Sequence, residues 1–147
     1  MIKQQLLSTG LALLLASSLP FTALADTTDT TVSIRDGSDH TIGSIDYTNT
    51  NYALDVHGNG TNVTVDGNVK SDNGYGITAG DNSTTTVKGD LSANRVAINA
   101  GGEAEVTIDG DVRGTGSTSN TIEVGGKTDI TVKGDVIAED TSAIRTD

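Results

Sequence analysis

The chain of 147 residues is acidic and poor in aromatic residues, and these properties exclude several classes of protein. It carries 20 Asp and Glu against 9 Lys and Arg, which gives a formal net charge of −11. A surface of this sign repels nucleic acid and anionic lipid, so we expect no nucleic-acid partner. The chain has no Cys, which excludes a disulfide framework and a thiolate metal site.

Residues 1–25 are typical of a cleavable secretory signal peptide. Lys3 supplies a positive charge, Leu6–Leu19 is mostly apolar, and Ala23-Leu24-Ala25 has the small-x-small pattern of a cleavage site. An uncleaved anchor helix is the alternative. We expect residues 1–25 to lie outside the fold and the chain to be exported to the periplasm, the cell surface or the medium. The only Met, Phe and Pro fall in this segment, so we expect the core to consist of Val, Ile, Leu and Ala.

Residues 26–51 are expected to form a degenerate first coil of a repeat, in which Val32–Gly37 is an imperfect copy of the later units. Residues 52–147 carry the repeat itself and end in the middle of a coil. Ser142–Asp147 resembles the opening of another unit, as seen at Arg95–Asn99. The expected domain organisation is therefore a signal peptide, a degenerate coil and a repeat region.

The repeat region is marked by glycines that recur at intervals of 21–24 residues. Each glycine follows a short segment in which apolar residues alternate with polar ones, and one Thr in each segment is always present. After each glycine and one polar residue, an apolar residue returns. The equivalent glycines are Gly67, Gly89, Gly110 and Gly134, and the equivalent threonines are Thr64, Thr86, Thr107 and Thr131.

Strict alternation predicts strands with one buried and one wet face. A second alternating segment precedes each unit, as at Tyr52-Ala53-Leu54-Asp55-Val56. A unit of this length without a helical stretch matches one coil of a parallel β-helix, in which like residues stack on like. We predict an all-β fold, a right-handed single-stranded parallel β-helix of about five coils. Disorder is the competing interpretation, against which the periodicity argues.

Charged residues before the four glycines alternate in sign, in the order Asp66, Lys88, Asp109 and Lys133. If the coils stack in register, each Asp meets a Lys on the neighbouring coil. The alternation therefore supports stacking.

Three acidic residues follow the repeat glycines directly: Asp90, Asp111 and Asp135, with Asn68 at the fourth position. Stacked carboxylates could share Ca²⁺, and these are the candidate metal ligands. The alternative, which we favour, is that they are corner residues that bond to the backbone. No calcium-binding nonapeptide is complete, because Gly101-Gly102-Glu103 and Gly125-Gly126-Lys127 lack the third glycine. We expect no cofactor.

The threonine column could suggest an ice-binding face, but charged residues flank it, and we interpret it as β-propensity on a wet face. A fragment of a β-helical polysaccharide lyase or glycosidase is the alternative function. We expect no enzyme, because clustered acids with a basic residue are not evident in the sequence and Trp is absent.

The signal sequence, the apolar-Thr-apolar-x-Gly-Asp/Asn units and the absence of Cys together resemble the β-helical passenger regions of bacterial autotransporter and filamentous-haemagglutinin-type adhesins. The resemblance covers roughly residues 32–147 and implies adhesion or self-association at the cell surface. It implies partners on host or bacterial surfaces, or other copies of the chain, and a truncated passenger whose membrane link would be a C-terminal barrel. No catalytic motif of such proteins is present.

Overall fold

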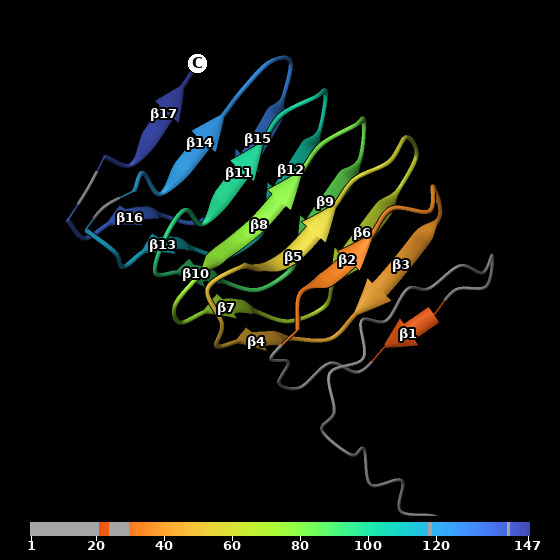
Figure 1. Ribbon diagram of the computed structural model, residues 1–147, viewed down its shortest axis with the longest axis horizontal. Helices are drawn as coiled ribbons and strands as arrows, with labels where there is room; N and C mark the ends of the chain where they lie inside the picture. Colours follow the sequence, from red (N-terminus) through yellow and green to blue (C-terminus); the bar gives the residue numbers. More distant parts are fainter. Residues whose placement is uncertain (1–20, 24–29, 118, 141) are drawn as a thin grey trace, which may run out of the picture.

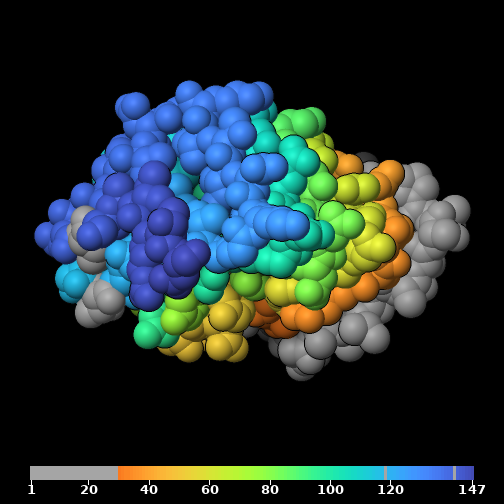
Figure 2. Space-filling view, turned by 90° about the horizontal axis from the view of Figure 1, so that it is seen from above, coloured from red at the N-terminus to blue at the C-terminus, as the bar shows by residue number. Residues whose placement is uncertain are grey.

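The computed structural model describes residues 21–23, 30–117, 119–140 and 142–147. Every regular element among them is a β-strand, and every strand pairing is parallel. The strands form three sheets that wind into a β-solenoid of about five turns, as predicted (Figure 1). Successive coils are visible as bands of colour along the molecule in Figure 2.

Each complete coil contributes one strand to each sheet. Sheet A contains β1 (Phe21–Ala23), β3 (Asp39–Ile42), β6 (Asn62–Val65), β9 (Thr84–Val87), β12 (Glu105–Ile108) and β15 (Asp129–Val132). Sheet B contains β4 (Ile45–Tyr47), β7 (Val69–Ser71), β10 (Leu91–Ala93), β13 (Val112–Gly114) and β16 (Val136–Ala138). Sheet C contains β2 (Val32–Ile34), β5 (Tyr52–Val56), β8 (Tyr75–Ala79), β11 (Ile98–Ala100), β14 (Ile122–Val124) and β17 (Ile144–Thr146).

The core is a column of small apolar side chains between the three sheets. Val106 and Ile108 point inward from β12 and are fully buried, whereas Thr107 between them is half-buried on the outer face. The same alternation occurs on β6 and β9, and like residues stack in register, as in the pairing of Val65 with Val87. Burial of these side chains contributes roughly 25 cal/mol per Å² of apolar surface.

Tyr47 is an exception to the expected aliphatic core. It is 1% exposed, and it is among the largest fully buried side chains. It lies on β4 in the first coil, where β7 stacks Ser71 against it in register. The small Ser71 side chain leaves room for the Tyr47 ring, whereas a second large side chain at that position would occupy the same space. This explains how an aromatic ring fits into a core of small cross-section.

The first coil is more regular than the sequence suggested. Val32–Ile34 pairs with the upstream strand of the second coil, not with its Thr-containing strand. The equivalent of Asn62–Val65 is Asp39–Ile42, so Thr41 extends the threonine column by one rung. Val32–Gly37 therefore opens the first coil, and the Thr-containing strand of this coil lies at Asp39–Ile42, with one residue fewer at the corner that follows.

Both ends of the solenoid carry a single additional strand (Figure 1). At one end β17 stacks on β14 and pairs Ile144 with Ile122, as its resemblance to the start of a unit predicted. At the other end β1 pairs with β3 in parallel register. The expectation that residues 1–25 take no part in the fold is therefore wrong for Phe21–Ala23. The remainder of the predicted signal peptide, Leu24 and Ala25 of its cleavage site included, lies outside the described residues.

Candidate functional site

The outer face of sheet A carries the threonine column. Thr41, Thr64, Thr86, Thr107 and Thr131 stack in register on consecutive rungs. Acidic residues flank the column at the start of the strands, where Glu105 pairs with Asp129. A charged border of this kind differs from a uniform hydroxyl and methyl surface, so the column is best explained by the β-propensity of Thr on a wet face.

The alternating charges form ion pairs between coils, which confirms that prediction for two pairs. Lys88 Nζ lies 2.7 Å from Asp66 Oδ1, and Lys133 Nζ lies 2.8 Å from Asp109 Oδ1. The hydrogen bond to the Asp66 carboxylate raises the pKa of Lys88 above its usual value. Because the side chains are largely exposed, these pairs set the register more than they stabilise the fold.

The corner after the threonine strands is built as a hydrogen-bonded ladder. The backbone N–H of Asp111 donates to Asp90 Oδ1 at 2.9 Å, and the N–H of Asp135 donates to Asp111 Oδ1 at 2.9 Å. The same bond joins Asp90 to Asn68 at 2.8 Å and Asn68 to Ser44 Oγ at 3.2 Å. One side-chain oxygen per rung thus accepts the amide of the next coil. We call Ser44, Asn68, Asp90, Asp111 and Asp135 the corner ladder.

The corner ladder leaves no room for a side chain at the repeat glycines, and this lack of room, not backbone conformation, explains why they are glycine. Gly67, Gly89, Gly110 and Gly134 do not have positive φ. A Cβ built on any of them would overlap the ladder oxygen of the preceding coil. Positive φ, which glycine adopts at low cost, occurs instead at other turns, such as Gly58 and Gly102, with φ of 98° and 60°. Glycine at the corner lets a side chain from one coil reach the backbone of the next.

This geometry bears on the calcium candidates. In Asp90 and Asp111, one carboxylate oxygen accepts a backbone amide, and uncharged Asn68 and Ser44 fill the same role on other rungs. Among the residues that the structure describes, no group of three or more His, Asp or Glu side chains is arranged to hold a metal ion. The ladder therefore accounts for the recurrence of these oxygens from coil to coil by hydrogen bonding alone.

A second polar cluster, on the outer face of sheet C, was not found from the sequence. Asp55 is only 8% exposed and accepts hydrogen bonds from Arg35 Nη2 at 2.5 Å and Ser33 Oγ at 2.9 Å. His57 lies between two carboxylates, with Nε2 at 3.2 Å from Asp55 Oδ1 and Nδ1 at 3.1 Å from Asp81 Oδ2. The imidazole thus joins the second coil to the third. The sequence signal for this cluster is that Arg35, Asp55, His57 and Asp81 occupy nearby positions of the repeat on successive units.

Ser38, His40 and Asp36 resemble a catalytic triad in composition but not in geometry. His40 Nε2 contacts Ser38 Oγ at 3.0 Å and Asp36 Oδ1 at 2.9 Å, so one nitrogen serves both partners. A triad requires the acid and the nucleophile on opposite nitrogens. Burial opposes ionisation of Asp36, but hydrogen bonds from His40 and Ser38 outweigh it and lower the pKa of Asp36. This cluster closes the first coil and has no arrangement for nucleophilic catalysis.

Comparisons of the chain with protein-family models, with curated proteins and with solved structures found no match. Within the described part of the chain, no helix has the length and apolar character needed to cross a membrane.

Proposed function

We propose that the chain is a secreted or surface-displayed β-solenoid that acts as a structural passenger in adhesion or self-association. The observation that carries this proposal is the continuity of the corner ladder from Ser44 to Asp135. Polar side chains that could take part in a reaction at a single rung instead form the hydrogen bonds that join each rung to the next. Such a stack is suited to present the same surface repeatedly along a rod, and repeated presentation strengthens weak contacts.

The C-terminal face of the stack supports the self-association part of the proposal. A hollow of about 350 Å³ opens there, and apolar side chains dominate its lining. Ile144 on β17 is 56% exposed, which is unusual for a residue of this kind. Strand edges of the last described coil that lie beside exposed apolar side chains favour pairing with a further β-strand. The lining residues are Ile122, Val124, Thr128, Ile130, Val132, Val136 and Ile144.

Expression of the chain with its own N-terminus in a Gram-negative host tests the proposal. We expect processing before Asp26, which mass spectrometry of the purified protein detects, and recovery outside the cytoplasm. Surface protease treatment and cell-aggregation assays then report display and self-association. Ala25→Glu is the matched control, because a large charged residue at the cleavage site blocks processing. An unprocessed chain that remains in the cytoplasm would contradict export and, with it, the adhesive role.

A further inference from the structure

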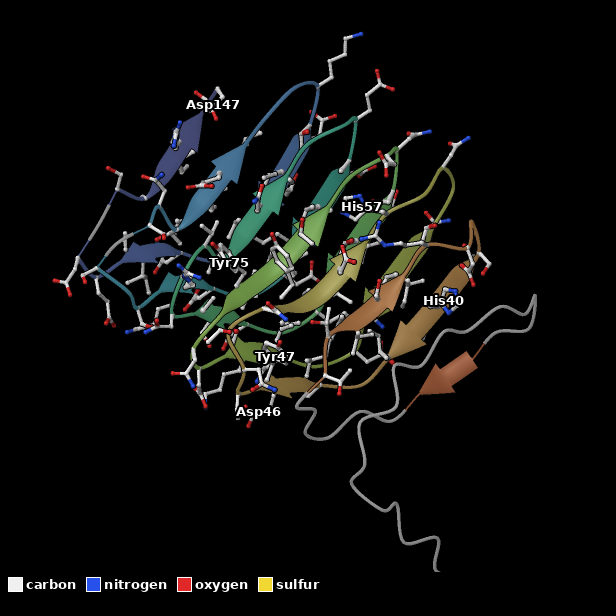
Figure 3. The ribbon with its side chains drawn as sticks, in the orientation of Figure 1. His40, Asp46, Tyr47, His57, Tyr75 and Asp147 are labelled. Atoms are coloured by element: carbon white, nitrogen blue, oxygen red, sulfur yellow. The ribbon has the colours of Figure 1, made fainter. Side chains whose placement is uncertain are left out.

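All three tyrosines of the chain gather at one corner of the solenoid, where sheets B and C meet. Tyr47 and Tyr52 line a hollow of about 660 Å³ beside the segment that joins β4 to β5. The ring of Tyr75, one coil further along, lies with its centroid 5.0 Å from that of Tyr52. Arg95 follows on the next coil, with its guanidinium carbon 4.9 Å from the centre of the Tyr75 ring. Figure 3 shows Tyr47 on β4 and Tyr75 at the start of β8.

The rest of the hollow is lined by hydroxyl, amide and carboxylate side chains. Its volume lies in the range of small-molecule sites, and most of its lining residues carry polar side chains. Hydroxyl and amide groups donate and accept hydrogen bonds, whereas ring faces pack against C–H groups. The ligand that combines many hydroxyls with an apolar C–H face is a sugar ring. The polar lining residues are Thr30, Thr31, Ser33, Asn49, Thr50, Asn51 and Asp55.

The electrostatics of the hollow favour binding over cleavage. Among the lining residues that the structure describes, Asp55 is the only carboxylate, and Ser33, Arg35 and His57 already engage it. Hydrolysis of a glycoside requires two carboxyl groups that flank the bond, and the described lining supplies one. The net charge of −11 repels an anionic glycan. A neutral oligosaccharide therefore fits the site best.

We propose that this tyrosine corner binds a neutral oligosaccharide through stacking on Tyr52 and hydrogen bonds from Asn51 and its neighbours, with Tyr75, Arg95 and the buried Tyr47 as supporting residues. The proposal specifies the class of ligand that the proposed adhesive function would use, and the biological role of the binding rests on that proposed function. The binding itself does not depend on export, so the two can fail separately.

Calorimetric titration of the purified full chain tests the site. The probes are cellohexaose, chitohexaose and mannohexaose, with oligogalacturonate as an anionic comparator. Tyr52→Ala removes the stacking ring and Asn51→Ala removes an exposed amide. Tyr52→Phe keeps the ring, and Lys127→Ala changes a side chain that is 89% exposed at a turn of the fifth coil, outside the lining. Circular dichroism verifies that each variant keeps its strands.

We expect at least one neutral hexasaccharide to bind with a Kd of about 1 mM or tighter. Tyr52→Ala should weaken that affinity by about tenfold or more, and Asn51→Ala should weaken it by a smaller factor. Tyr52→Phe and Lys127→Ala should leave it unchanged. The proposal is overturned if none of the three neutral probes binds, if only the anionic probe binds, or if neither Tyr52→Ala nor Asn51→Ala changes the affinity. If Tyr52→Ala fails to fold, Asn51→Ala decides.

Discussion

Replacement of Gly110 by Ala tests the structural role of the corner directly. A Cβ at this position would overlap Asp90 Oδ1 and lie 2.7 Å from the carbonyl oxygen of Gly89. The first contact displaces the carboxylate that accepts the amide of Asp111. The second contact is with backbone, which cannot rotate away. The substitution therefore forces two neighbouring coils apart at this corner.

The expected cost follows from these two contacts. Overpacking of a close-packed site costs about 1–3 kcal/mol, and loss of one hydrogen bond costs about 0.5–1.5 kcal/mol. Together they lower the free energy of unfolding by about 1.5–4.5 kcal/mol. Since each coil is stabilised mainly by its neighbours, a break at the fourth corner also weakens the cooperativity of the stack.

Gly125→Ala is the matched control, because a Cβ at Gly125 meets nothing within 4 Å and its φ is not positive. We expect this variant to stay within about 1 kcal/mol of the parent, with a small gain from the reduced freedom of the unfolded chain. Urea unfolding followed by circular dichroism measures both variants. Equal midpoints for Gly110→Ala and Gly125→Ala would refute the steric account of the repeat glycines.

Three further substitutions probe separate features. Thr85 is fully buried, and its Oγ1 has no hydrogen-bond partner among the described residues, so Thr85→Val should raise the free energy of unfolding by about 1 kcal/mol in urea titrations; no gain would show that the hydroxyl is satisfied. Asp111→Asn keeps an acceptor oxygen and should be nearly neutral, whereas Asp111→Ala should cost about 1 kcal/mol; a lower melting temperature in EGTA would instead favour calcium. Asp36 has a lowered pKa, so its contribution is present above its unfolded pKa and disappears as the pH falls through the folded value. Asp36→Asn should therefore lower the thermal midpoint at pH 7 but not in strong acid, and an equal deficit at both pH values would contradict this linkage.

Much of the fold could be predicted because each coil of the solenoid needs the same buried positions and the same corner, so the same residue pattern recurs in the sequence. A buried side chain every second residue and a glycine every 21–24 residues specify strands, corners and in-register stacking. The first coil looks degenerate in the sequence because its corner is one residue shorter and because His40 occupies the inward position that Val63 has on the next coil. Tyr47 was missed as a core residue because burial of a ring depends on which small side chain lies on the next coil, and Ser71 is 24 residues away.

Side-chain clusters were harder to predict than strands, because they combine residues from different coils. The Asp55–His57–Asp81 contacts and the Tyr52–Tyr75 stack join positions that lie on neighbouring rungs. A difference of one residue in the length of a corner or turn changes which side chains meet. The register between coils determines which of these separated residues meet, and the structure supplies that register.

The corner ladder also changes how the Asp-Gly-Asp of residues 109–111 is understood. Asp109 belongs to the ion-paired column, Gly110 leaves room for the preceding coil, and Asp111 belongs to the ladder. Each of the three residues therefore contacts a different neighbouring residue, and a change of residue type at one position need not be matched at the other two. Ser44 and Asn68 show that the ladder needs an oxygen within reach of the next amide, not a charge. A position that accepts Ser, Asn or Asp is specified by hydrogen-bond geometry, which is why stacking explains it better than catalysis or metal binding.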